Sequence, residues 1–334
     1  MDDLIKAVKE CYFSWNTFSV VSDTVSKFCA QASAVQLERF QDSLLDVLVL
    51  GTFAQEHPIH PGLSTKFFKS LVLLLETHGA EVHEKMYESV VIPMTAATAS
   101  SKPNLKVPAQ KSYFRQNSHL CSLIESRDLI SDGTTGLRTW EAARVLTGHI
   151  LGNPDLIVKD SSVVELGAGL GFVGISLLKS NFVRRAVLTD FHPKVLEMLA
   201  ANGRINFPDM DDDSAAGEEY LELKEREEGR SLTVSHWDWE ADAIPNSVAA
   251  LRPDTVLAAD VVFDPSILPF LVKSIKTSLT LFASRAIIAC TVRNPETLDK
   301  FRHHLHQEDF NVKETDISFE EDKSEVIAFT ITLK

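Results

Sequence analysis

A glycine-rich turn at residues 163–174 constrains the fold of this chain more than any other feature. It reads Val-Val-Glu-Leu-Gly-Ala-Gly-Leu-Gly-Phe-Val-Gly, an apolar strand that ends in an acid and leads through four glycines into a helix. Glycine permits positive φ and lets a ligand approach the main chain. A second acid, Asp190, ends the next predicted strand, 185–189, where it can accept hydrogen bonds from ribose hydroxyls. The pattern predicts an adenosine site in an α/β fold.

Two cofactor classes fit this glycine spacing. A G-x-G-x-x-G pattern begins at Gly169, with Asp190 about 20 residues further on, as in dinucleotide-binding proteins. An E-x-G-x-G-x-G pattern begins at Glu165 and matches the turn of S-adenosylmethionine-dependent methyltransferases. The second pattern explains Glu165, which would lie near the cationic methionine part of the cofactor but would repel a pyrophosphate. The motif therefore favours a methyltransferase, with an NAD oxidoreductase as the alternative.

The rest of the second half supplies further strands and helices. Residues 255–260 read as a buried parallel strand whose last residue, Asp260, should lie beside the cofactor. The remaining elements are predicted as helices at 266–282 and 295–306, a strand at 286–291 and a terminal β-hairpin formed by 311–317 and 325–333. An antiparallel hairpin at the end of a parallel sheet resembles the seven-stranded, Rossmann-like methyltransferase fold.

Several motifs together resemble the family-16 lysine methyltransferases. They are a Gly-Thr-Thr-Gly-Leu segment from Gly133 that runs on to Trp140, the turn at Glu165, His-Trp-Asp-Trp at 236–239, and Ala259-Asp260-Val261-Val262-Phe263, which fits the family's Asp/Glu-x-x-Tyr/Phe motif. The Thr-Val-Arg-Asn-Pro-Glu-Thr segment at 291–297 and the His-Pro-x-His-Pro segment at 57–61 resemble the branch that methylates a lysine of eukaryotic elongation factor 2.

The resemblance implies a set of cofactor-binding residues. Trp140 and Trp239 would supply flat apolar surface, and Asp238 would lie near the adenine amine. The other implied contacts are Glu165 near the methionine part, Asp190 at the ribose, and the main chain of Gly167, Ala168, Gly169 and Ala259. The tryptophans could instead be core residues that do not contact the cofactor. Trp140 falls in an apolar helix expected at 137–151, and Trp237 and Trp239 are expected on one face of a strand.

The resemblance also implies the catalytic residues, in a reaction that transfers methyl from S-adenosylmethionine to a lysine amine. Asp260 is the candidate for receiving and orienting the amine, and Phe263 would wall the channel. The alternative for Asp260 is an acid at the N-terminus of the helix that follows Pro265. A small-molecule methyltransferase and a non-catalytic cofactor-binding protein are the competing functions.

The first part of the chain reads as a mostly helical module, residues 1–115, before a methyltransferase domain, residues 116–334. Apolar residues at helical spacing predict helices at 4–15, 35–50 and 65–78, and a polar segment at 96–110 reads as a linker. This module is expected to shape the surface for a protein substrate or, alternatively, only to brace the sheet.

Composition limits the partners and the compartment. The net charge of −14 argues against a nucleic-acid or membrane surface, and much of it lies in an acidic region, 209–228, expected to be a solvated loop. The four scattered cysteines fit a reducing compartment and predict no metal site. No basic leader or long apolar run is evident, so we expect a cytoplasmic protein. We also expect a monomer, and the family resemblance implies elongation factor 2 as the protein substrate.

Overall fold

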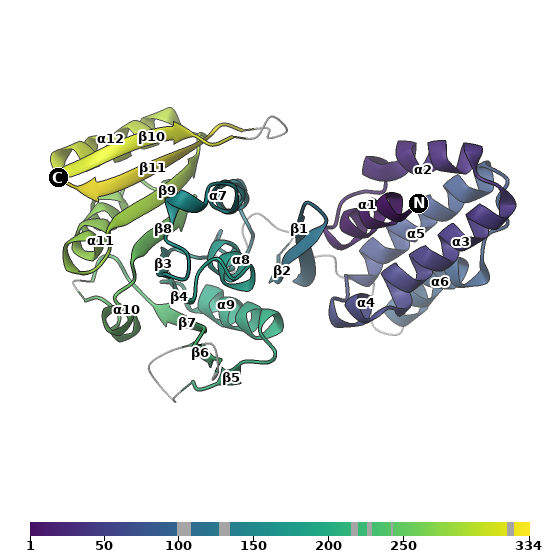
Figure 1. The fold of residues 1–334 in the computed structure, drawn as a ribbon, viewed down its shortest axis with the longest axis horizontal. Helices are drawn as coiled ribbons and strands as arrows, with labels where there is room; N and C mark the ends of the chain where they lie inside the picture. The colour runs from purple at the N-terminus through teal and green to yellow at the C-terminus, as the bar shows by residue number, and fades with distance from the viewer. Residues whose placement is uncertain (99–107, 127–133, 215–219, 226–228, 242, 319–323) are drawn as a thin grey trace. The chain divides into compact units, whose positions relative to one another are not determined.

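The computed structural model describes residues 1–98, 108–126, 134–214, 220–225, 229–241, 243–318 and 324–334. The chain divides into two compact units, residues 1–128 and residues 129–334 (Figure 1). The first unit includes a two-stranded antiparallel sheet of β1 (Ala109–Arg115) and β2 (Ser118–Glu125). The boundary predicted after residue 115 falls between these paired strands.

The first unit is otherwise helical. Its helices are α1 (Asp2–Phe13), α2 (Ser19–Gln31), α3 (Ala34–Leu45), a π-helical turn (Asp46–Leu50), α4 (Thr52–Glu56), α5 (Pro61–Thr77) and α6 (Glu84–Thr98). They enclose an aromatic core in which Phe13, Phe40 and Phe68 are almost fully buried. The three predicted helices are present, with the 35–50 segment continuing from α3 into the π-helical turn.

Local capping explains where these helices begin. Ser33 and Gln36 form a reciprocal capping box at the start of α3. His60 Nδ1 accepts a hydrogen bond from the Gly62 amide at 3.0 Å, and Pro61 occupies the first turn of α5. The His-Pro-x-His-Pro segment thus has a structural part, since His60 caps α5.

The second unit is built on a sheet whose described residues form nine strands in the order β10-β11-β9-β8-β3-β4-β7-β6-β5. The parallel strands are β3 (Ser162–Leu166), β4 (Arg185–Asp190), β7 (Ser231–His236), β8 (Thr255–Ala259) and β9 (Arg285–Thr291). The antiparallel strands are β10 (Phe310–Asp316), β11 (Val326–Leu333), β6 (Leu221–Lys224) and β5 (Asp211–Asp212).

Helices cover both faces of this sheet (Figure 1). One face carries α7 (Glu141–Gly152), α8 (Phe172–Lys179) and α9 (Pro193–Asn206); the other carries α10 (Asn246–Leu251), α11 (Leu268–Leu281) and α12 (Pro295–Gln307). A short 3₁₀ turn, Pro154–Leu156, follows α7. The central strands are apolar on both faces because both faces are covered: Val164 and Val256 point to one face, Val163 and Leu257 to the other, and all four are fully buried.

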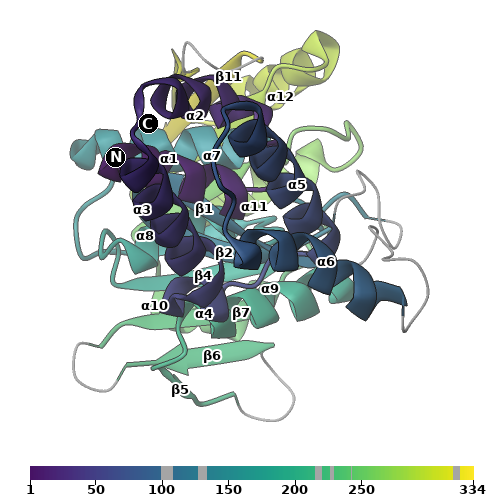
Figure 2. The ribbon, with the colours of Figure 1, turned by 90° about the vertical axis from the view of Figure 1, so that its right-hand side faces the viewer.

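The expectation of seven strands is corrected to nine in the described part of the sheet. The two additional strands, β5 and β6, lie at the lower edge in Figure 2 and come from the acidic region that was expected to be a loop. Leu221 and Leu223 are buried, and the charged residues Glu222 and Lys224 alternate with them. This two-residue alternation is typical of a β-strand, so the segment forms one despite its charge. Residues 215–219 and 226–228 of the acidic region lie outside the described residues.

Two further corrections concern the tryptophans. The helix expected at 137–151 begins only at Glu141, so Trp140 is its N-cap rather than an interior residue. β7 ends at His236, which places Trp237 and Trp239 in the following loop and not on a strand face. None of the described helices combines the length and apolar character needed to cross a bilayer.

Candidate active site

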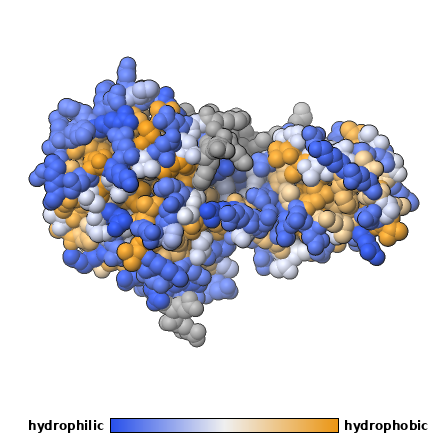
Figure 3. Space-filling model, turned by 45° about the horizontal axis from the view of Figure 1, so that its top comes forward, coloured by the Kyte–Doolittle hydropathy of each residue, from blue (hydrophilic) through white to orange (hydrophobic). Residues whose placement is uncertain are grey.

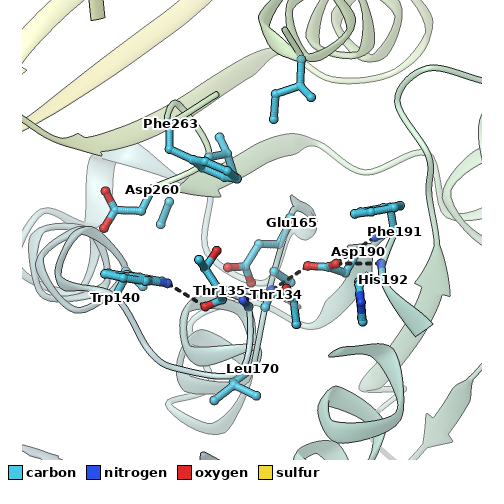
Figure 4. A pocket seen from close by; sticks show the side chains of 18 of the residues that line it. Thr134, Thr135, Trp140, Glu165, Leu170, Asp190, Phe191, His192, Asp260 and Phe263 are labelled. Carbon is cyan, nitrogen blue, oxygen red and sulfur yellow. Dashed lines mark hydrogen bonds between the residues drawn. The ribbon is translucent and has the colours of Figure 1, made fainter. Parts of the chain in front are cut away.

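A cavity of about 570 Å³ opens at the carboxyl ends of the parallel strands in the second unit. Its volume is within the usual range for small-molecule and cofactor sites. All eleven residues predicted for the site line it: Trp140, Glu165, Gly167, Ala168, Gly169, Asp190, Asp238, Trp239, Ala259, Asp260 and Phe263. Figure 4 shows several of their side chains around the opening.

The glycine turn forms one wall through its main chain. Gly167 has φ +62°, and a Cβ there would lie 2.8 Å from Val261 Cγ1 and 3.4 Å from the Trp239 ring. Gly169 also has positive φ, and its amide donates to Asp190 Oδ2 at 3.2 Å. Only glycine combines this backbone with this close packing, so the turn can present bare main chain to a ligand.

Asp190 ends β4 beside this turn. Its carboxylate accepts hydrogen bonds from the amides of Gly169, Phe191 and His192 at 3.2, 2.9 and 3.1 Å (Figure 4). Burial raises the pKa of Asp190, while the three amides oppose that shift. The backbone amides thereby fix a hydrogen-bond acceptor at the edge of the cavity.

Glu165, at the end of β3, is 2% exposed. Its Oε2 atom accepts a hydrogen bond from the Gly174 amide in the first turn of α8, at 2.9 Å. Burial raises the pKa of Glu165 to about 8, and the neighbouring Asp190 carboxylate adds to the shift. Glu165 is therefore largely protonated at neutral pH unless a cation enters the cavity.

The aromatic wall includes Trp140 and Trp239. The Trp140 indole Nε1 donates to the Thr135 carbonyl at 3.0 Å, which fixes the ring at the N-terminus of α7. Trp239 is partly buried, whereas Trp237 is 3% exposed and belongs to the apolar core. Packing in this core is thus the main role of the Trp237 side chain. Asp238 between them accepts from the Glu240 amide at 2.9 Å.

Asp260 follows β8 with a positive φ of 56°. Its side chain is only 3% exposed, and it accepts hydrogen bonds from the Thr291 amide and hydroxyl, both at 2.9 Å, from the Ala142 amide at 3.2 Å and from Arg293 Nη2 at 3.1 Å. In Figure 4 the carboxylate points away from Glu165 and Asp190. The alternative for Asp260, an acid at the N-terminus of the helix that follows Pro265, is wrong. The carboxylate instead accepts the Ala142 amide in the first turn of α7.

Phe263 and Phe191 are both strongly exposed at the cavity, by 59% and 61%. Phe191 was not predicted from the sequence, although its position directly after the strand-ending acid was a usable signal. Thr134 and Thr135 were not predicted either, although they belong to the Gly-Thr-Thr-Gly-Leu motif, and Ile267 and Phe270 line the cavity without a motif of their own. Gly133 lies outside the described residues.

The charge of the cavity distinguishes the two cofactor classes. Six aspartate and glutamate residues line it, against one arginine, Arg138, among the described lining residues. Such a lining attracts cations and disfavours a pyrophosphate. The described residues contain no group of three or more His, Cys, Asp or Glu side chains arranged to hold a metal ion.

Residues 125–308, more than half of the chain, match the sequence family described as lysine methyltransferase. The chain belongs to this lysine methyltransferase family. The predicted family and enzyme class are confirmed, and S-adenosylmethionine, the predicted cofactor, is the methyl donor of such enzymes. An NAD oxidoreductase is excluded as the alternative.

Curated relatives support this membership. The protein-lysine N-methyltransferase EEF2KMT of Bos taurus is 31% identical over 283 residues, 81% of each chain. The protein-lysine N-methyltransferase EFM3 of Chaetomium thermophilum is 31% identical over 71% of this chain and 68% of that protein. Among solved structures, the methyltransferase domain of bacterial CtHen1 matches with a TM-score of 0.43 and 12% identity, over 58% of this chain and all of that one.

Proposed function

We propose that this lysine methyltransferase modifies a lysine of elongation factor 2. The observation that supports methyl transfer at this site is the acidic cavity of the second unit, which all eleven predicted residues line. Relatives that match most of the chain are named protein-lysine N-methyltransferase EEF2KMT, which supports the substrate. A protein substrate of this kind would be met in the cytoplasm, where we place the enzyme.

The cavity suits an adenosine cofactor with a cationic methionine part. Asp190 would accept from the ribose hydroxyls, and the main chain from Gly167 to Gly169 would contact the methionine part. Trp140 and Trp239 would enclose the apolar faces, with Asp238 near the adenine amine and the Ala259 backbone at the opposite wall. Glu165 would ionise opposite the positive charge, because an adjacent cation favours the carboxylate.

S-adenosylmethionine supplies a methyl group already activated by the positive charge on its sulfur. In the proposed reaction the lysine amine would form the new carbon–nitrogen bond as the carbon–sulfur bond breaks, and the sulfur would leave as a neutral thioether. A free lysine has a pKa of about 10.4, and only the neutral amine can attack. The main tasks of the protein are therefore to orient the amine, exclude water and let the ammonium proton pass to solvent.

Phe263 and Asp260 are the residues we propose for these tasks. Phe263 stands exposed at the cavity and would wall the channel around the lysine stem. The Asp260 carboxylate already has four donors, so the amine would use the remaining lone pair on Oδ1 or take the place of Arg293 on Oδ2.

We further propose that the helical unit helps to bind the protein substrate. Figure 3 shows apolar side chains gathered on the viewed face of this unit, amid a largely hydrophilic surface. Its exposed apolar residues include Val20 at 66%, Leu73 at 64% and Val35 at 58%. Apolar side chains that gather on one face, as in Figure 3, commonly mark a protein–protein contact.

The test is methyl transfer from labelled S-adenosylmethionine into a cell extract, with and without added S-adenosylhomocysteine as product inhibitor. A labelled protein of the size of elongation factor 2, carrying methyl-lysine by mass spectrometry, is the expected result. Label in other proteins or in small molecules would contradict the substrate but retain the chemistry. No label with purified elongation factor 2, under conditions where the cofactor binds, would overturn the proposal.

A further inference from the structure

Arg293 lies in the Thr-Val-Arg-Asn-Pro-Glu-Thr segment after β9, which the function proposed so far leaves unused. It is not among the described residues that line the cavity, and its side chain is 46% exposed. Its guanidinium nevertheless contacts two residues that do line it, Asp260 and Trp140.

The two contacts differ in kind. Arg293 Nη2 lies 3.1 Å from Asp260 Oδ2, an ion pair with a carboxylate that is itself almost fully buried. Arg293 Cζ lies 4.7 Å from the centroid of the Trp140 ring, within the distance of a cation–π interaction. A planar guanidinium can stack on a ring and donate in its own plane at the same time, which an ammonium cannot do.

Asp260 extends this contact to the helix that carries Trp140. The Oδ2 atom that pairs with Arg293 also accepts the Ala142 amide at 3.2 Å, in the first turn of α7, and Trp140 is the N-cap of that helix. Trp140 is thus restrained through its Nε1 hydrogen bond to Thr135, through α7 and through the guanidinium over its ring. Arg293 connects the last two restraints.

We propose that Arg293 is a positioning residue that holds the Trp140 indole in the wall of the cofactor cavity through an Asp260–Arg293–Trp140 cluster. The proposal rests on the function proposed above, since it assumes that Trp140 contacts the cofactor. Arg293 is not among the described residues that line the cavity and acts by keeping the indole and the N-terminus of α7 in their binding positions.

The experiment measures S-adenosylhomocysteine affinity by calorimetry, with the full-length protein. Arg293→Ala should weaken binding about fivefold, and Arg293→Lys should recover part of the loss because the ion pair returns without the planar stack. Arg302→Ala is the matched control. Arg302 also pairs with acids, Asp299 and Glu314, and lies 5.9 Å from the Phe329 ring, but away from the cavity. It should change affinity less than twofold.

A double-mutant cycle tests whether Arg293 acts through Trp140. In a Trp140→Leu background, Arg293→Ala should change affinity less than twofold. Wild-type affinity in the Arg293→Ala variant, or a full fivefold loss in the Trp140→Leu background, would overturn the inference alone. If Arg293→Ala does not fold, Arg293→Lys takes its place: wild-type affinity in Arg293→Lys, or a loss of affinity that is undiminished in the Trp140→Leu background, would overturn the inference alone. Failure of the wild type to bind S-adenosylhomocysteine would instead overturn the proposed function and this inference with it.

Discussion

Glu165 and Gly174 are joined by a hydrogen bond of 2.9 Å between the carboxylate Oε2 and the backbone amide. The bond connects the end of β3 to the first turn of α8, where the helix dipole favours negative charge. Burial outweighs this favourable contact and raises the pKa of Glu165 to about 8. The cavity thus contains an acid that changes its charge close to physiological pH.

This pKa predicts that S-adenosylmethionine binds more tightly as pH rises. The sulfonium cation favours ionised Glu165, so binding below pH 8 releases a proton, and the affinity should increase by up to about tenfold per pH unit between pH 6 and 8. Calorimetry in buffers of different ionisation enthalpy measures the released proton. S-adenosylhomocysteine, which lacks the sulfonium charge, should show a shallower dependence.

Glu165→Gln is the matched control for this prediction. It should make S-adenosylmethionine affinity nearly independent of pH between 6 and 8. The stability of the wild-type protein without cofactor should also depend on pH. The pKa of Glu165 is about 8 in the folded state and about 4.3 in the unfolded state, so the folded state binds the proton more tightly. The contribution of this proton to the unfolding free energy is therefore complete below about pH 4.3 and is lost as pH rises through about 8. Equal pH dependence in the wild type and Glu165→Gln would refute the assignment.

Asp260→Asn separates a role in transfer from a role in bracing. The amide keeps the volume of the carboxylate but replaces one acceptor by a donor facing Thr291 and Arg293, so we expect a loss of about 1–3 kcal/mol in unfolding free energy. If Asp260 orients the amine, kcat should fall about 100-fold, with S-adenosylhomocysteine affinity reduced no more than fivefold. A near-normal kcat at saturating cofactor, together with lower stability, would make Asp260 a brace only.

The sequence correctly predicted the cavity residues that lie at the ends of parallel strands. Glu165, Asp190 and Asp260 were expected at one cavity because the carboxyl ends of parallel strands meet at one edge of a sheet, and all three line it. The bonds that orient Asp260 could not be foreseen, since Ala142 is 118 residues away in the chain. No local pattern encodes a contact of that kind.

Strands with unusual composition also escaped prediction. β6 is short and lies within a run of acids, where charge suggested a loop although Leu221 and Leu223 alternate as in a strand. The β1–β2 sheet was not predicted: the polar segment 96–110 was interpreted as a linker, and the module boundary was placed after residue 115, between the two strands. In the sheet, the hydroxyls of Ser112 and Ser122 bond each other across the strands at 2.7 Å. Buried polar pairs of this kind become evident only when the strands are paired.

Gly171→Ala should destabilise the second unit strongly. Gly171 has φ +86°, and a Cβ there would lie 2.4 Å from Leu199 Cδ1 and 2.9 Å from Ile175 Cδ1. Backbone strain and overpacking together should cost about 2–5 kcal/mol of unfolding free energy, measured by denaturant titration. Gly229→Ala is the control, because Gly229 has φ +67° but open space around it, and should cost about 1–2 kcal/mol. Equal losses in both variants would show that packing against α9 contributes nothing.

Val20→Ser with Leu73→Ser should impair use of the protein substrate without affecting the cofactor. Both side chains are exposed on the helical unit, so their replacement removes apolar contact area and leaves the core intact. We expect KM for elongation factor 2 to rise roughly threefold or more, with kcat and S-adenosylhomocysteine affinity unchanged. Val158→Ser is the matched control, since Val158 is 66% exposed on the second unit. An unchanged KM in the double variant would assign the exposed apolar residues of the helical unit no part in substrate binding.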